Sequence, residues 1–288
     1  MRSDCARGPA PTSMTVRRVS FLINLCSTIL IGFLSVCAWA QDVKVDLPRD
    51  FRNAVPDRAV LTESAIVIAV PNENELYLNG RHVEQKSLGR EIERLIRGKI
   101  AGGEIAYFAC GASIPYRVVI EIFNVVREQD IGKIGLIVES GAKQPAMPMV
   151  FPVEVPLPWK AGEDISKLKP NPLTLMAAVS SDGRLTLNHD SGPKRGQLCF
   201  ASAPKGLGTD PLRLQQWLEC LFENRTQQHA YAIGMETRTD LPLAQRIEKT
   251  VFVKGTLSLK YVDVLRVIDA VKGSGAHPVG LQIDDLRE

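Results

Sequence analysis

The residue with the clearest chemical consequence lies in the apolar N-terminal part of the chain, at Asn24. An acidic side chain in a membrane span has a raised pKa, so it can take up a proton on one side and release it on the other. No Asp or Glu stands between Asp4 and Asp42. Asn24 can form hydrogen bonds but cannot ionise. The span therefore holds a polar group that cannot carry a proton.

Residue types that support catalysis or metal binding are scattered along the chain. The four histidines form no HxH or HExxH pair, and the six cysteines form no CxxC spacing. The segment IRGKIAGG, from Ile96, lacks the glycine spacing and the following Ser or Thr of a phosphate-binding loop. The glycine-rich GSGAHPVG, from Gly273, follows a predicted helix, which is typical of a helix end. We predict no enzyme, no metal site and no cofactor.

The composition is that of a folded protein with no affinity for nucleic acid. A hydrophobic content of 45% is ordinary for a globular chain, and a net charge of +3 without a long Lys/Arg run does not favour nucleic-acid binding. Beyond the apolar span only Cys110, Cys199 and Cys220 remain, far apart and odd in number. No disulfide framework is predicted, and pairing of two of the three stays open.

The uncharged run Val19–Gln41 has two interpretations. Its 23 residues are enough for a helix across the roughly 30 Å hydrocarbon core. The arginines before it place residues 1–18 in the cytoplasm and the bulk of the chain outside. The same residues also fit a secretory signal that starts at Met14 and ends in an Ala-Trp-Ala cleavage site at 38–40. Both interpretations export the remainder and differ in whether it stays tethered.

The exported part repeats itself. IVIAVPNENELYLNG, from Ile66, and LMAAVSSDGRLTLNH, from Leu175, match at a constant offset of 109 residues. Both have the pattern of a strand, a polar turn and a second strand, with the alternation of half-buried strands.

A second and longer match follows at an offset of 145 residues. It joins IPYRVVIEIFNVVREQDIGKIGLIVES, from Ile114, to LKYVDVLRVIDAVKGSGAHPVGLQIDD, from Leu259. The apolar spacing predicts a helix and then a short strand in each copy. The repeat-equivalent positions, to which we assign packing or capping roles, include Tyr116 with Tyr261 and Gly135 with Gly280.

One further helix is predicted between the two matches in each copy, at Ser87–Gly98 and at Arg213–Asn224, with an offset of 126 residues. The second copy therefore gains 17 residues before this helix and 19 after it. We interpret both insertions as surface loops or small added elements.

The predicted fold is mixed α/β (α+β): a membrane helix or signal peptide followed by two small strand-strand-helix-strand-helix-strand domains. The Pro-rich connection between the domains is expected to be extended. The predicted parts are a cytoplasmic N-terminus at 1–18, the span at 19–41, an extended linker at 42–63, the first domain at 64–141, the Pro-rich linker at 142–171, and the second domain with its two insertions at 172–288.

This arrangement resembles the ExbD/TolR family of biopolymer-transport proteins. The N-terminal span is followed by DVKVDLP, a strand pair ending ELYLNG, a helix, and PYRVVIEIFNVVREQDIGKIGLIVE, which has the aromatic-led helix and final strand of that family. The resemblance covers roughly residues 16–140 and recurs more weakly over 172–286.

The resemblance implies a single-pass subunit of a proton-motive-force-linked transport or envelope motor in the bacterial inner membrane, with its bulk in the periplasm. The implied partners are an ExbB/TolQ-like polytopic protein and a TonB-like or cell-wall partner. The family carries protons on one aspartate near the cytoplasmic start of the span, nine residues before a phenylalanine. Here Asn24 and Phe33 have that spacing, so proton transfer at this position is not expected.

Three alternatives follow for the whole chain. With the span retained, which we expect, the protein is an accessory or non-proton-carrying motor subunit. With the span cleaved, the protein is a soluble periplasmic tandem module. The third alternative, from a different functional class, is a periplasmic binding or scaffold protein unrelated to motors. The duplication also suggests that the two copies pair as an internal pseudo-dimer, with homo-oligomers as the other arrangement.

Overall fold

The computed structural model describes residues 43–97, 104–139, 147–158, 171–188 and 207–283. Within them it has five α-helices and one 11-stranded mixed sheet, so the predicted mixed α/β class is confirmed. The span at 19–41, with Asn24, lies outside the described residues. None of the described helices is both long and apolar enough to cross a membrane.

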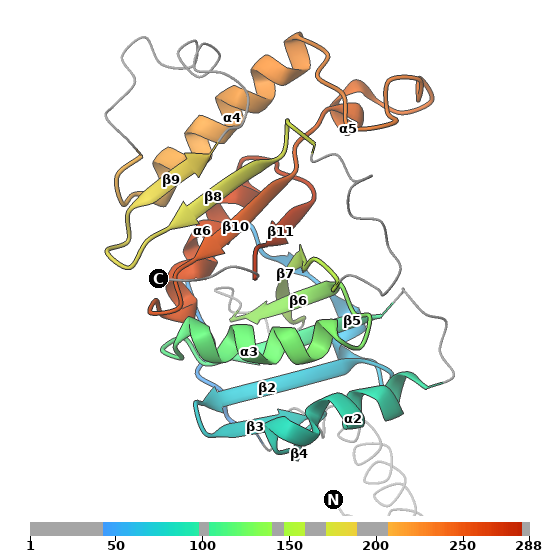
Figure 1. Ribbon diagram of the computed structural model, residues 1–288, viewed down its shortest axis with the longest axis vertical. Helices are drawn as coiled ribbons and strands as arrows, with labels where there is room; N and C mark the ends of the chain where they lie inside the picture. The colour runs from blue at the N-terminus through green and yellow to red at the C-terminus, as the bar shows by residue number, and fades with distance from the viewer. Residues whose placement is uncertain (1–42, 98–103, 140–146, 159–170, 189–206, 284–288) are drawn as a thin grey trace, which may run out of the picture. The chain divides into compact units, whose positions relative to one another are not determined.

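The first repeat, drawn from blue to green in Figure 1, has the order strand-strand-helix-strand-helix-strand. A two-residue strand, β4, extends its hairpin. Its elements are β2 (Ile66–Asn72), β3 (Glu75–Leu78), β4 (Arg81–His82), α2 (Gln85–Ile96), β5 (Ile105–Cys110), α3 (Tyr116–Arg127) and β6 (Lys133–Val138).

The second repeat, drawn from yellow to red, has the same order with a short helix added. Its elements are β8 (Leu175–Val179), β9 (Leu185–Asn188), α4 (Pro211–Gln227), α5 (Leu243–Arg246), β10 (Val251–Gly255), α6 (Tyr261–Gly273) and β11 (Val279–Leu281). In both repeats the strands that follow the hairpin pair in parallel, giving β3-β2-β5-β6 and β9-β8-β10-β11.

The two repeats share one sheet, where two separate domains were predicted. Strand β7 (Met149–Glu154), from the predicted Pro-rich linker, pairs antiparallel with β6 and parallel with β11. Its contact with β11 is the single pair Gly280 with Glu154, and β1 (Val55–Pro56) pairs with its other end. Pro152 lies between these two contacts, where a missing amide leaves no ladder hydrogen bond unmade.

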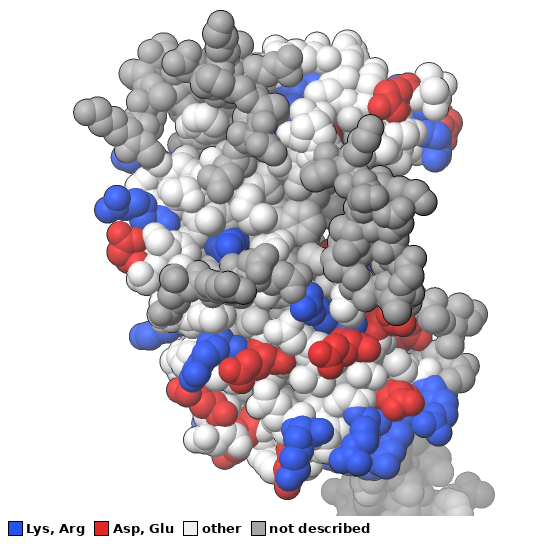
Figure 2. Space-filling view, viewed as in Figure 1, with Lys and Arg blue, Asp and Glu red and all other residues white. Residues whose placement is uncertain are grey.

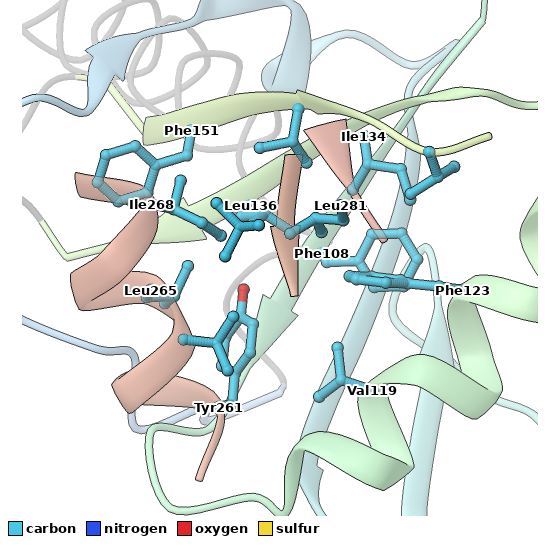
Figure 3. Packing of buried hydrophobic residues seen from close by; sticks show 14 of the residues in the cluster. Phe108, Val119, Phe123, Ile134, Leu136, Phe151, Tyr261, Leu265, Ile268 and Leu281 are labelled. Carbon is cyan, nitrogen blue, oxygen red and sulfur yellow. The ribbon is translucent and has the colours of Figure 1, made fainter. Parts of the chain in front are cut away.

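One hydrophobic cluster runs through both repeats, because alternate residues of every long strand face the helices. Figure 3 shows Tyr261, Leu265 and Ile268 of α6 in the same cluster as Phe108 and Phe123 of the first repeat. Phe108 and Phe123 meet edge to face, with ring centroids 4.5 Å apart. On the face seen in Figure 2, acidic and basic side chains are interspersed over the first repeat.

The repeat-equivalent glycines lie beneath aromatic rings. Gly135 is the register partner of Tyr107, and Gly280 is the partner of Phe252. A Cβ atom at Gly135 would stand 2.5 Å from the Tyr107 ring, and one at Gly280 would stand 2.4 Å from the Phe252 ring. The offset of 145 residues joins both members of each pair. An aromatic side chain that covers a glycine on the neighbouring strand is therefore part of the repeat.

The second insertion is tied to its repeat by a buried arginine. Arg225 of α4, 5% exposed, donates through Nη1 to the carbonyl oxygen of Glu248 over 2.8 Å and through Nη2 to that of Leu173. Burial lowers the pKa of Arg225 to about 10, and the negative charge of Glu248 opposes this shift. The insertion is thus an ordered element that includes α5.

Substituting Gly280 by Ala should lower the free energy of unfolding by about 1–3 kcal/mol, because the new methyl group overlaps the Phe252 ring. Urea unfolding of the purified chain measures this effect. Combining Gly280→Ala with Phe252→Leu should cost less than the sum of the two single changes. Gly89→Ala, in α2 beside flexible side chains, is the matched control and should change stability by less than about 1 kcal/mol. Additive effects at positions 252 and 280 would contradict the proposed packing.

Candidate functional site: the seam between the repeats

The two repeats meet through hydrogen bonds between equivalent residues, which we call the seam (residues 112–117 and 257–262). The amide of Tyr116 donates to the carbonyl oxygen of Leu259 over 2.7 Å, and the amide of Tyr261 donates to that of Ile114 over 2.8 Å. Tyr116 with Tyr261 and Ile114 with Leu259 are each 145 residues apart. Each bond is thus the image of the other, as in an isologous interface.

A second reciprocal pair of hydrogen bonds extends the seam, with donors one residue later and acceptors two residues earlier than in the first pair. The backbone amide of Arg117 donates to the carbonyl oxygen of Leu257 over 3.2 Å, and the amide of Val262 donates to that of Ala112 over 3.3 Å. The two donors, and the two acceptors, are again 145 residues apart. All four donors belong to the first two residues of α3 and α6. The first amides of a helix have no partner within that helix. Here they are bonded by the opposite repeat.

Neither helix has a capping side chain of its own. Pro115 precedes α3 and Lys260 precedes α6, and neither caps its helix through the side chain. These two residues face each other as an isolated antiparallel bridge. The seam therefore replaces the polar side chain that usually caps a helix start.

The rings of Tyr116 and Tyr261 are buried behind this bridge, each 1% exposed. The hydroxyl groups of both have no hydrogen-bond partner among the described residues. Burial raises the pKa of both phenols, and the nearby Cys110 and Tyr116 raise that of Tyr261 further. Tyr116 also packs within 3.1 Å of where a Cβ atom of Gly255 would stand. The two tyrosines are thus packing residues of the seam.

An N-terminal segment, residues 43–57, docks on both repeats; we call it the strap. On the first repeat, Ala112 donates to the carbonyl oxygen of Asp46 over 2.9 Å, and Arg49 forms an ion pair with Glu139. Phe51 meets the buried Phe151 of β7 edge to face, with ring centroids 5.4 Å apart.

The strap then reaches α6 of the second repeat. The carboxylate of Asp269 accepts hydrogen bonds from the amides of Arg52 and Asn53 over 3.2 and 2.8 Å. The side-chain amide of Asn53 donates to the same carboxylate over 3.1 Å and to the Asp269 carbonyl oxygen over 3.0 Å. The residues directly after the predicted span are therefore bonded to both repeats.

At its end the strap pairs with β7 as β1 and turns into the 3-10 helix η2 (Arg58–Leu61). Asp57 caps this turn by accepting from Ala59 over 2.9 Å, and its other oxygen accepts from the hydroxyl of Tyr107 over 2.8 Å. Burial, followed by the hydrogen bond and charge of Asp57, raises the pKa of Tyr107.

A cleft of about 120 Å³ lies where the strap, the first repeat, β7 and the second repeat come together. Each of these four parts contributes at least one polar side chain to the cleft. The other lining residues are mostly aliphatic residues or prolines. The lining residues are Asp57, Ile105, Tyr107, Lys133, Ile134, Gly135, Val150, Pro152, Val153, Glu154, Lys272, His277, Pro278 and Val279.

Lys272 is the positively charged group of this cleft whose pKa is shifted. It stands in the last turn of α6, and burial lowers its pKa to about 8, against the opposing influence of the Glu154 charge. Its side chain has no hydrogen-bond or ion-pair partner among the described residues. No described group of three or more His, Cys, Asp or Glu residues could hold a metal ion. The cleft thus has two lysines and two carboxylates among its polar groups, of which Lys272 is the partly buried amine without a bonded partner among the described residues.

The structure brings Tyr116 and Tyr261 together, and it places Gly135 and Gly280 in different repeats beneath aromatic rings. Sequence reasoning missed the strap, the central position of β7 and the cleft. The Tyr107–Gly135 pair was detectable, because the offset of 145 maps it onto Phe252 and Gly280. Lys272 had no signal, since its burial arises only when the two repeats and β7 meet.

The comparisons with known proteins give no relative: no family model, no characterised protein and no solved structure matches this chain. The functional argument therefore depends on the residues and on the geometry described above.

Replacing Tyr116 or Tyr261 by Phe should leave the free energy of unfolding unchanged or raise it by about 1 kcal/mol, because each change removes a buried hydroxyl without a partner. Tyr107→Phe is the matched contrast: it removes a hydrogen bond to a carboxylate and should cost about 1.5–3 kcal/mol. Urea unfolding of the three variants measures both effects. A loss at positions 116 and 261 as large as that at 107 would show that these hydroxyls are bonded.

Proposed function

We propose that this protein is an ExbD/TolR-like subunit of a proton-motive-force-linked transport or envelope complex of the bacterial inner membrane. In this proposal the span at 19–41 is retained as a single-pass anchor, and the two repeats lie in the periplasm as an internal pair. The subunit does not carry protons, because Asn24 occupies the aspartate position implied by the resemblance. Its partners are an ExbB/TolQ-like polytopic protein and a TonB-like or cell-wall component.

The observation that carries the proposal is the reciprocal seam. Four amides at the starts of α3 and α6 are bonded by residues of the opposite repeat at one constant offset. Isologous contacts of this kind are what two identical subunits make. A single chain that contains such a pair supports a function in which domains of this type act in twos, with one anchor for each pair.

Two further features support export and tethering. Cys220 is disulfide-bonded, whereas the buried Cys110 is free. Disulfides persist in oxidising compartments such as the periplasm. The strap begins directly after the predicted span and is bonded to both repeats, so an anchor would be connected to the pair as a whole.

The alternative is a signal-cleaved periplasmic binding or scaffold module that is not coupled to proton flow. The cleft between the strap, β7 and the two repeats is the observation that favours it, because a small-molecule site needs no membrane partner.

Affinity purification of the full chain from detergent-solubilised membranes tests the proposal. We expect an intact N-terminus and a co-purifying polytopic membrane protein in more than one copy per chain. Mass spectrometry of the same sample measures the N-terminus. Loss of about 40 residues, together with recovery from the soluble periplasmic fraction, would instead establish the cleaved alternative.

The Asn24→Asp variant tests the altered proton position. An aspartate in an apolar span has a raised pKa and can cycle between charged and neutral forms. We expect proteoliposomes containing the co-purified complex to conduct protons faster with this variant than with the natural chain. Asn24→Ser, which is polar but not ionisable, is the control and should not conduct. Equal conductance of both variants would remove Asn24 from any proton route.

A further inference from the structure

The cleft contains one partly buried positive charge that no described residue neutralises by direct contact. Lys272 reaches the cleft from the end of α6, and its side chain has no bonded partner among the described residues. Moving an ammonium group out of water without pairing it costs free energy, which explains the lowered pKa of this amine, about 8.

The other charged or titratable groups of the cleft differ in their surroundings. Asp57 accepts from the Tyr107 hydroxyl and from the Ala59 amide. Lys133, which is exposed, and Glu154 are register partners across β6 and β7, and no ion pair joins them among the described residues. The negative charge of Glu154 also partly offsets the lowering of the Lys272 pKa by burial, yet no ion pair joins these two side chains among the described residues. His277 lies at the exposed rim.

The rest of the lining limits the size and polarity of a ligand. Ile105, Val150 and Pro278 are among the aliphatic and proline residues that line most of the cleft. Its volume of about 120 Å³ is roughly four times the share of one water molecule in liquid water. A molecule of about six non-hydrogen atoms, apolar at one end and anionic at the other, matches these two properties.

We propose that the cleft binds a short aliphatic monocarboxylate, with the carboxylate on the Lys272 ammonium group and the chain against the aliphatic wall. The ligand would contact the strap, both repeats and β7 at once, because all four line the cleft. Binding therefore favours the paired arrangement of the repeats and raises the stability of the whole chain by an amount that grows with the logarithm of the ligand concentration once this exceeds the Kd.

Calorimetric titration of the full chain with butyrate tests this proposal. We expect saturable binding of one butyrate per chain, and no binding of butyramide, which has the same shape without the charge. Lys272→Met should weaken binding about tenfold or more, because it removes a charge-assisted hydrogen bond. Lys86→Met is the matched control: Lys86 lies on α2, pairs with Glu84 over 2.8 Å and does not line the cleft.

The pH dependence gives a second readout. The ligand carboxylate needs the protonated amine, whose pKa is about 8, so affinity falls as the pH rises through this value, by about tenfold from pH 7 to pH 9. Lys272→Arg keeps its charge at pH 9 and should remove this decrease, which also separates loss of charge from loss of folding.

Three results would overturn the proposal: absence of saturable butyrate binding, equal binding of butyramide, or equal weakening by Lys86→Met and Lys272→Met. None of these bears on the membrane partner or on the anchor, so the site and the proposed function fail separately.

Discussion

The structure depends on a helix-capping arrangement that neither repeat can complete alone. The first two amides of α3 are bonded by the second repeat, and those of α6 are bonded by the first. Apart from its partner, each repeat would turn these amides to water and would also expose the apolar surface that the shared cluster now buries. Pairing therefore stabilises both repeats, and the two tyrosines are buried in the paired structure.

The connection between the repeats is a structural element in its own right. The connection forms β7, which lies between β6 and β11. The last residues of the strap form β1, which pairs with the first residues of β7, at the end away from the contact with β11. A duplicated pair has two of every element, but β7 and the strap occur once. They make the pseudo-symmetric pair asymmetric, and the cleft is formed at the point where these unique elements meet the repeated ones.

The sequence predicted the parts that depend on local pattern. Apolar spacing located the helices, as α3 and α6 show, and the alternation around Leu76 and Leu185 located the hairpins. Tyr116 and Tyr261 stood out because the repeat preserves them. What was not predicted depends on contacts distant in sequence: the Pro-rich connection reads as a linker until β6 and β11 stand on either side of it.

The candidate site was predictable to the same limited degree. The glycines and tyrosines of the repeat were identified, whereas Asp57 and Lys272, 215 residues apart, have no shared pattern that would relate them. Asp57 resembles any turn residue, and Lys272 resembles any basic residue near a helix end. Their meaning comes only from the cleft that the folded chain forms.

The reciprocal seam also bears on how such a chain can change over generations. In a dimer of identical subunits every substitution appears on both sides of the axis, so a change that suits one side must be tolerated on the other. Here each side is encoded separately. Cys110 is the repeat counterpart of Gly255, and Gly111 is that of Thr256, at the same offset of 145. Because the two faces are encoded separately, one can change while the other preserves the pairing.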